Sequence, residues 1–463
     1  MKIKYVSPLD AAFMMVERDD MPWHIANLML FTKPSGAAPD FVPALREQMR
    51  GQSVVAPYDQ APAFPSARWV PLQRRVEEID FDHHVRLHTL PDGADDQDLL
   101  ALVSEIHGEG LDPRHPSWEM HLIDGVSGSR FGIFMKLHHS ILDGVTGMRR
   151  MLRWLTTDPT DLARPAIFSV GPDALTATRD VPTLKERVRR RSVAVAELSR
   201  NVSQLFRKEF DGQPLAAPYG VPKTVWSGPV SRGRSVSYRS FELNELKVVA
   251  RAHGVGVSDL VLYMCGSALR TYLLAHGDVP ARSLTAGAPF NIRAEGDERP
   301  GSSFAFLTVD LGTDIADARE RLSRVKASND SSKAQVATLG PEALALQTVV
   351  ANGPMIATMA MGMRGKTLPA FGVVVSNVPG PPELLYLNGA RLDAMIPISI
   401  PMHNSPFNMT CIGYDGKMTF GVAAASEQVV DVDLITEGLA SALDELRGVE
   451  PSVTRGADGS VKP

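Results

Sequence analysis

The sequence predicts an α/β protein with two layered halves of similar size. At 463 residues the chain is too long for one ordinary hydrophobic core, so two domains are expected. Strand-like and helix-like segments alternate in both halves, which is typical of sheets covered by helices. A break separates the halves, because prolines, which interrupt regular structure, recur from Asp158 to Thr183.

Apolar runs and helical spacing give the elements of each half. In the first half, strands are expected over 28–31, 121–123 and 131–137, and a helix over 98–107. In the second half, strands are expected over 236–241, 283–288, 304–311 and 371–375, and helices over 243–252 and 259–274. The predicted organisation is an N-terminal subdomain, a linker, a C-terminal subdomain and a disordered tail, over 1–180, 181–231, 232–450 and 451–463.

The linker is expected to contain a basic amphipathic helix over 184–210. Its arginines cluster at 187, 189, 190 and 191, and apolar residues recur beside them at helical spacing. Such a helix either lies on an anionic membrane surface or packs between the domains with a solvated basic face. The sequence leaves both interpretations open.

The chemistry is expected where the buried strand over 131–137 ends. His138 and His139 follow that strand, and Asp143 and Gly144 come after three further residues. A neutral imidazole is suited to proton abstraction near pH 7, since its unperturbed pKa is about 6.5. The chain contains no Gly-x-Ser-x-Gly and no His-Glu-x-x-His. His139 is therefore the predicted general base and His138 its packing neighbour.

The other members of this motif are expected to act through structure. The Asp143 carboxylate is predicted to hold the loop, and Gly144 to permit a tight turn that a side chain would obstruct. A second pair, His83-His84, has no Asp-Gly after it and serves as an internal comparison. That pair is predicted to be structural.

Through these and further motifs, the chain resembles a known family. His-His-x-x-x-Asp-Gly is the signature of acyltransferases related to chloramphenicol acetyltransferase and to peptide-synthetase condensation domains. More narrowly, the chain resembles the bacterial wax ester synthase/diacylglycerol acyltransferase family. The motifs that carry this resemblance are spread over nearly the whole chain, at 7–13, 81–85, 111–112, 116–119, 376–381, 387–390 and 413–421.

Several positions depart from the family pattern. Serine replaces the usual leucine at Ser117 and the usual asparagine at Ser227, Ser258 and Ser302. The segment 288–293 replaces a common Pro-Val-Ser-x-Arg pattern. The histidine motif is intact, so acyl transfer is still expected, whereas the acceptor is left open.

The resemblance implies a fold and a set of site residues. It implies two chloramphenicol-acetyltransferase-like subdomains with a central tunnel, which acyl-CoA and the acceptor enter from opposite faces. Pro116 and Trp118 are implied to be structural. The implied tunnel residues are Ser258, Asp259, Asn291, Arg293, Ser376, Asn377, Pro379 and Gly380. Asn377 is expected first as a wall residue, because Pro-Gly-Pro shapes a tight turn after it.

The methionine-rich segment 344–363 has two interpretations. Methionine adapts to irregular apolar ligands, so this segment is a candidate lining for a lipid. The other interpretation, which the sequence favours, is an ordinary core helix interrupted at Gly353-Pro354.

Composition limits the partners. A net charge of -5 gives no reason to expect nucleic acid. The two cysteines, Cys265 and Cys411, lack metal-ligand spacing, so no metal is expected, and they suit a reducing cytoplasm. No run of 18 apolar residues occurs, so no membrane span is expected, and the N-terminus lacks a signal-peptide core. If the basic helix lies on a membrane, the implied lipid substrates would fit peripheral attachment to a membrane, on its inner face, or to a lipid droplet.

The predicted reaction is direct acyl transfer without an acyl-enzyme. The resemblance implies that an acceptor hydroxyl of diacylglycerol or a long-chain alcohol attacks acyl-CoA, which is a substrate, and no further cofactor is expected. Two alternatives are kept. One is an acyltransferase with a non-lipid acceptor or a carrier-protein-bound donor, and the other is a non-catalytic acyl-CoA-binding or lipid-binding protein.

Overall fold

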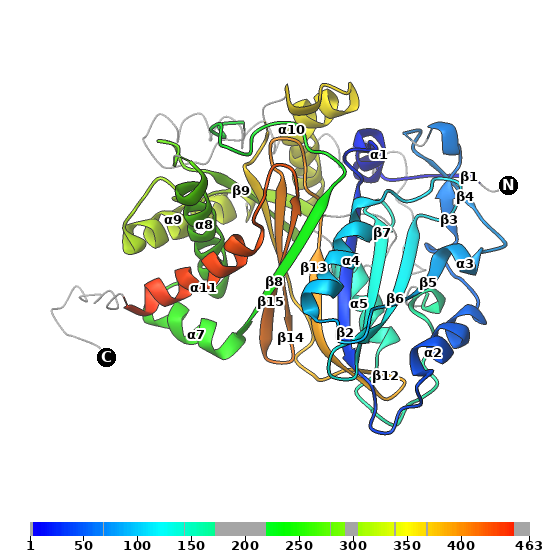
Figure 1. Ribbon diagram of the computed structural model, residues 1–463. Coiled ribbons are helices and arrows are strands. Elements are labelled where there is room, and N and C mark those ends of the chain that lie inside the picture. Colours follow the sequence, from blue (N-terminus) through cyan, green and yellow to red (C-terminus); the bar gives the residue numbers. More distant parts are fainter. Residues whose placement is uncertain are drawn as a thin grey trace.

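The computed structural model describes residues 3–67, 69–142, 144–171, 219–277, 279–291, 304–337, 339–366 and 369–448. Two sheets stand side by side in the middle of the molecule, and helices cover their outer faces (Figure 1). The basic helix expected over 184–210 and the tail after 450 lie outside the described residues.

The first half is built on a sheet of six described strands, in the order β12-β13-β2-β7-β6-β5. These strands are Tyr386–Leu387, Ala390–Ile398, His24–Thr32, Arg130–His138, Trp118–Val126 and Val85–Thr89. All neighbours are antiparallel except β5 and β6. A small sheet lies beside it, with β1 (Ile3–Tyr5), β4 (Leu72–Arg75) and β3 (Gln60–Pro62). The described helices of this half are α1 to α5, over Pro8–Val16, Phe41–Arg50, Phe81–His84, Asp96–Gly108 and Gly144–Trp154.

The second half is built on another sheet of six described strands, in the order β10-β9-β11-β14-β15-β8. These strands are Phe304–Asp310, Thr285–Asn291, Val373–Val378, Phe407–Tyr414, Lys417–Ala425 and Arg234–Glu242. Its described helices are α7, α8, α9, α10 and α11, over Leu243–Ala252, Val257–His276, Ala318–Ala337, Pro341–Ala360 and Asp433–Gly448. Helix α8 is buried along most of its length and forms the centre of this half's core.

The strand pairing corrects the division into two contiguous subdomains. Strands β12 and β13 belong to the predicted C-terminal subdomain in sequence, yet β13 pairs with β2 in the first sheet. Leu392, Met395 and Ile396 of β13 are fully buried there. No strand was expected over 390–398, and long-range pairing decides which sheet accepts it.

A glycine allows the two sheets to touch. Gly421 on β15 faces the carbonyl oxygen of Pro397 on β13, and a Cβ atom at Gly421 would lie only 1.9 Å from that oxygen. Helix α4 of the first half joins the second sheet through two hydrogen bonds to β8. Its Ser104 hydroxyl accepts from the Val236 amide at 3.0 Å, and the Asp96 carboxylate accepts from the Tyr238 hydroxyl at 3.0 Å.

Helix α10 corrects the expected interruption at Gly353-Pro354. The helix runs continuously from Pro341 to Ala360 with Pro354 inside it. At this point the hydroxyl of Tyr219 enters the helical ladder. It donates to the Ala351 carbonyl at 2.6 Å and accepts from the Met355 amide at 3.4 Å. A side chain from another segment thus satisfies backbone groups beside the proline, so the helix does not end.

Within the described residues, no single helix is long and apolar enough to cross a bilayer. Helices α7 and α8 pass that test of length and composition only when taken together, and they meet at an angle of 94°.

Candidate active site

The predicted base motif opens into a cavity between the two halves. The cavity has a volume of about 670 Å³. The first half lines it with residues of α1, β2, β7 and α5, and the second half with residues of β9, β10, α10, β11 and β14. Most of the lining is apolar, including Met135, Met148, Met151, Met355 and Met402. The cavity is of the size and character of a site for a largely apolar ligand.

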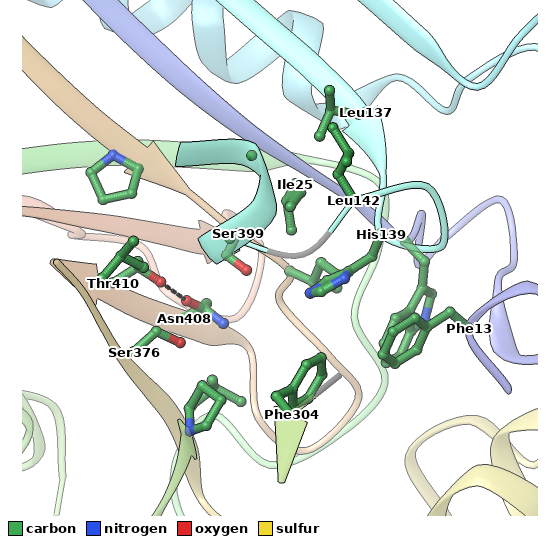
Figure 2. A pocket seen from close by; sticks show the side chains of 18 of the residues that line it. Phe13, Ile25, Leu137, His139, Leu142, Phe304, Ser376, Ser399, Asn408 and Thr410 are labelled. Carbon is green, nitrogen blue, oxygen red and sulfur yellow. Dashed lines mark hydrogen bonds between the residues drawn. The ribbon is translucent and has the colours of Figure 1, made fainter. Parts of the chain in front are cut away.

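His139 stands directly after β7 and points into this cavity (Figure 2). Its amide donates to the Trp23 carbonyl at 2.9 Å, which extends the pairing of β7 with β2 by one residue. The rings of Phe13 and Phe304 lie 4.8 Å and 5.8 Å from the imidazole, centroid to centroid. The end of a paired strand and two aromatic neighbours therefore fix the direction of this imidazole.

His138 faces the opposite way from His139, as successive residues of a strand do. Its side chain is buried outside the large cavity, and Nδ1 lies 2.7 Å from the Ser140 hydroxyl and 3.1 Å from the Ser140 amide. Nε2 lies 3.7 Å from a carboxylate oxygen of Glu17. His138 thus holds the loop after β7, and His139 is the histidine that reaches the cavity.

Polar groups gather on the wall across from His139. Ser376 on β11, Ser399 after β13, and Asn408 and Thr410 on β14 line this wall (Figure 2). The Thr410 hydroxyl donates to the Asn408 side-chain oxygen at 2.8 Å. This bond fixes the amide, so the NH₂ group of Asn408 is left as a donor on the cavity wall.

Asn408 and Thr410 are not among the site residues that the sequence predicts. A signal was present, because the buried strand over 407–414 places polar side chains at alternate positions beside apolar ones. Residues two apart share a face of a strand. Two polar residues on one face of an otherwise buried strand indicate a lined site.

The predicted tunnel residues divide into two groups. Ser376, Asn377 and Pro379 line the cavity. Gly380 is not among the lining residues. A Cβ atom there would lie 2.0 Å from the Gly413 carbonyl oxygen, so this glycine permits close contact of two backbones.

Ser258 and Asp259 also lie away from the cavity, which corrects their expected place in the tunnel. Both are in the first turn of α8. The Asp259 carboxylate accepts from the Gly256 amide at 2.9 Å and from the Asn329 side chain at 2.6 Å. The Ser258 hydroxyl lies 3.2 Å from the Lys333 ammonium. These contacts begin α8 and join it to α9.

Other predicted residues fall at or beyond the limits of the described chain. Asp143 and Arg293 lie outside the described residues, and Asn291 is described only as the last residue of β9. Gly144 lines the cavity as the first residue of α5. A Cβ atom at Gly144 would lie 3.6 Å from a methyl group of Val378, an ordinary contact, so no turn that only glycine permits is found there.

Pro116 and Trp118 hold the loop that contacts the His138-His139 motif. Trp118 is fully buried, donates from its indole to the Tyr58 carbonyl at 2.7 Å, and stacks on His84 and Phe168. The amide of Trp118 donates to the Pro116 carbonyl at 2.8 Å. Between them, the Ser117 carbonyl accepts from the His138 amide at 2.9 Å. This loop thus positions the backbone of the histidine motif.

Glu119 and His121 on β6 and Lys136 on β7 form a buried ionic network. The Lys136 ammonium is 2.9 Å from the Glu119 carboxylate, and His121 donates to the same carboxylate at 3.2 Å. Burial acts to raise the pKa of Glu119, but His121 and Lys136 outweigh it and hold that pKa well below its usual range. Burial lowers the pKa of His121 to about 4. Pairing of these buried groups stabilises the charged carboxylate between β6 and β7.

The two sheets with a cavity between them have the fold of peptide-synthetase condensation domains. In agreement, the first condensation domain of the calcium-dependent antibiotic synthetase shares this fold, with a TM-score of 0.59 over 97% of both chains at 13% identity.

The chain belongs to the wax ester synthase/diacylglycerol acyltransferase family. The model of the family's catalytic domain matches residues 6–261, and the model of its C-terminal domain matches residues 300–447. A solved wax ester synthase/diacylglycerol acyltransferase from Marinobacter aquaeolei VT8 is 29% identical, with a TM-score of 0.76 over 96% of this chain and 98% of that one.

Relatives of known sequence agree. A Mycobacterium tuberculosis protein named as a diacylglycerol O-acyltransferase is 30% identical over 98% of this chain and 99% of its own length. A Mycobacterium bovis protein with the same name is 32% identical over 95% of this chain and 90% of its own. The chain is accordingly an acyltransferase.

Proposed function

We propose that the protein moves a fatty acyl group from acyl-CoA to the hydroxyl of diacylglycerol or a long-chain alcohol, giving triacylglycerol or a wax ester. The observation that carries this proposal is the His139 imidazole at the end of β7, aimed into an apolar cavity of about 670 Å³. Family membership supports the reaction type, and the apolar lining supports a lipid substrate.

The placement of two polar groups on the cavity supports the following course for the proposed reaction. His139 takes the proton of the acceptor hydroxyl while the hydroxyl oxygen attacks the thioester carbonyl carbon. The carbonyl becomes a tetrahedral oxyanion, and the NH₂ group of Asn408, held by Thr410, is the donor proposed to stabilise it. The carbon–sulfur bond then breaks, and the imidazolium returns its proton to the coenzyme A thiolate.

Thiol release from palmitoyl-CoA across a panel of acceptors tests this function. Wild type should release coenzyme A when diacylglycerol or a long-chain alcohol is present. His139→Ala should lower turnover by the ~10²–10⁴-fold typical of a lost general base. His276→Ala is the matched control, because His276 is exposed on α8 and its ring packs against Tyr272.

Other results would contradict the proposal in distinct ways. Near wild-type turnover by His139→Ala would exclude the direct-base mechanism. Activity that requires a phosphopantetheinyl carrier protein would identify a different donor. Binding of palmitoyl-CoA without turnover, whatever the acceptor, would identify a non-catalytic binding protein.

We further propose that the protein attaches peripherally to a lipid surface through α10. The outward face of this helix presents Val350, Pro354, Ala357 and the following Met361, spaced by three or four residues and all exposed. Val350 and Met361 are 56% and 67% exposed. An apolar stripe facing solvent is typical of helices that lie in a membrane interface.

The surroundings of α10 support a lipid rather than a protein partner. Exposed Lys366 and Arg364 follow its last turn, and Arg364 also pairs with Asp20 at 2.9 Å. An exposed cation such as Lys366 favours anionic lipid headgroups. The opposite face of the same helix lines the cavity with Thr348, Asn352 and Met355. Helix α10 also packs beside α1, another cavity wall (Figure 1). A lipid bound to the outward face of α10 would thus be separated from the acyl cavity only by this helix.

A further inference from the structure

Three histidines that do not line the acyl cavity come together elsewhere in the first half. His83 and His84 end the short helix α3, and His115 lies in the loop before β6. One ring nitrogen from each of the three comes within 4.8 Å of the others. Neutral imidazole nitrogens are suitable ligands for zinc and neighbouring transition metals. We propose that His83, His84 and His115 bind a divalent transition-metal ion such as Zn²⁺.

His84 carries the proposal, because its tautomer is fixed with one nitrogen left over. The ring is fully buried, and its Nδ1 donates to the Trp118 carbonyl at 2.7 Å. Nε2 is therefore a lone-pair nitrogen, and it is buried without a hydrogen-bond partner among the described residues. A metal-bound histidine commonly donates its other ring nitrogen to a backbone carbonyl, as His84 does. A buried acceptor without a partner is costly, and a bound ion would remove that cost.

The other two rings have the freedom that ligation requires. His83 and His115 are only partly buried and stack with centroids 3.9 Å apart and planes at 16°. The His84 ring stands across the His83 ring at 88°. Stacked rings cannot both point their nitrogens at one ion, so His83 or His115 must turn about its Cβ–Cγ bond. Three protein ligands leave a fourth tetrahedral position for water.

The charges around the cluster are mixed. The Glu119 carboxylate lies 3.8 Å from the His83 ring, and Asp80 and Asp112 also interact electrostatically with His83. Opposing them, Arg86 donates to the His83 carbonyl at 2.9 Å, and its Nη2 lies 3.4 Å from Nδ1 of His83. The nearby carboxylates favour a cation at the three histidines. Arg86 holds the backbone of His83, one of the proposed ligands.

An ion here would join parts of the chain that support the histidine motif. It would tie α3 to the loop over 111–117, and the last residue of that loop, Ser117, accepts from the His138 amide. Trp118, which follows, stacks on His84 at 4.3 Å. The proposed role is therefore a structural clip that stabilises the loop below the active site. Sequence spacing predicts no metal, because His115 is brought to His83 and His84 only by folding.

Zinc binding by the full chain, with any affinity tag removed, tests the site. Competition with a chromogenic chelator at neutral pH should show a single Zn²⁺ bound per wild-type chain. His115→Ala should weaken binding by about 100-fold or more, since loss of even an outer partner of a metal site costs ~10–100-fold. Zinc should also raise the melting temperature of wild type and not that of His115→Ala.

Controls keep the test decisive. His83→Ala is a second ligand variant that, like His115→Ala, changes a partly exposed ring and leaves the buried His84 in place. His276→Ala removes an exposed histidine on α8 and should bind zinc as wild type does. The proposal is overturned if wild type binds no zinc, or if both ligand variants bind it as tightly as wild type. It is equally overturned if His276→Ala loses the same site.

Discussion

At the scale of single residues, the site depends on how two side chains are held. The His139 backbone is hydrogen-bonded to Trp23, and Phe13 packs against the imidazole ring. The Asn408 side chain is held through its oxygen by Thr410. In both cases the atoms that we propose to act in catalysis lie at the cavity, and groups fixed in this way can lower a barrier without reorganising during the reaction.

Replacing Asn408 should separate catalysis from binding. Asn408→Ala removes the proposed oxyanion donor, so kcat should fall by ~10²–10³-fold while KM changes little. Asn408→Asp should be as severe, because it keeps the shape and the bond from Thr410 but loses the NH₂ group. Thr410→Val should have a smaller effect, since it only frees the amide to rotate. Steady-state kinetics with palmitoyl-CoA would exclude this role if Asn408→Ala kept the wild-type kcat.

At the scale of elements, α10 has two faces with different environments. Its inward face lines the cavity and its outward face presents apolar side chains to solvent. The helix continues past Pro354 because Tyr219 satisfies the Ala351 carbonyl and the Met355 amide. The outward stripe therefore extends without interruption from Val350 to Met361, long enough to lie along a lipid surface.

Charges placed on this stripe should release the protein from lipid. Wild type should co-sediment with vesicles that contain anionic lipid. Val350→Asp combined with Met361→Asp should weaken binding by about tenfold or more, because burying one such side chain contributes roughly 1.5–3 kcal/mol. Val248→Asp is the matched control, since Val248 is 53% exposed on α7. If the double variant sediments as wild type does, lipid contact lies elsewhere on the protein.

At the scale of the whole molecule, buried histidines connect parts that are distant in sequence. Nε2 of His107, in the last turn of α4, donates to the Ser399 carbonyl after β13 at 3.1 Å. The His107 carbonyl in turn accepts from Nε2 of His24 on β2 at 2.9 Å. Burial, with Arg234 nearby, lowers the pKa of His107 to about 3.

Stability should therefore fall in mild acid. Below pH ~6.5 His107 is protonated in the unfolded chain but not in the folded protein. The contribution of neutral His107 to the free energy of unfolding is therefore complete above that pH and is lost as the pH falls toward 3. Between pH 7.5 and 5, this one group should cost about 2 kcal/mol of unfolding free energy. Urea titrations at both pH values should show a smaller drop for His107→Gln than for wild type. Equal drops would show that His107 does not control acid stability.

The sequence alone determined the local structure of this protein. Apolar periodicity predicts β7, α7, α8 and β8 near their observed bounds, because side-chain spacing depends on the element itself. The same reasoning places His139 at a strand end. Ordered motifs predict the acyltransferase family, which the comparisons confirm.

The tertiary structure decided what depends on contacts between distant segments. Only folding brings β13 to the first sheet, places Asn408 and His139 on the same cavity, and carries Tyr219 to α10. Only folding places Ser258 and Asp259, in the first turn of α8, against α9 instead of beside the cavity. The physical reason is that strand pairing and side-chain packing join residues hundreds of positions apart, and a local pattern carries no information about which partner will be met.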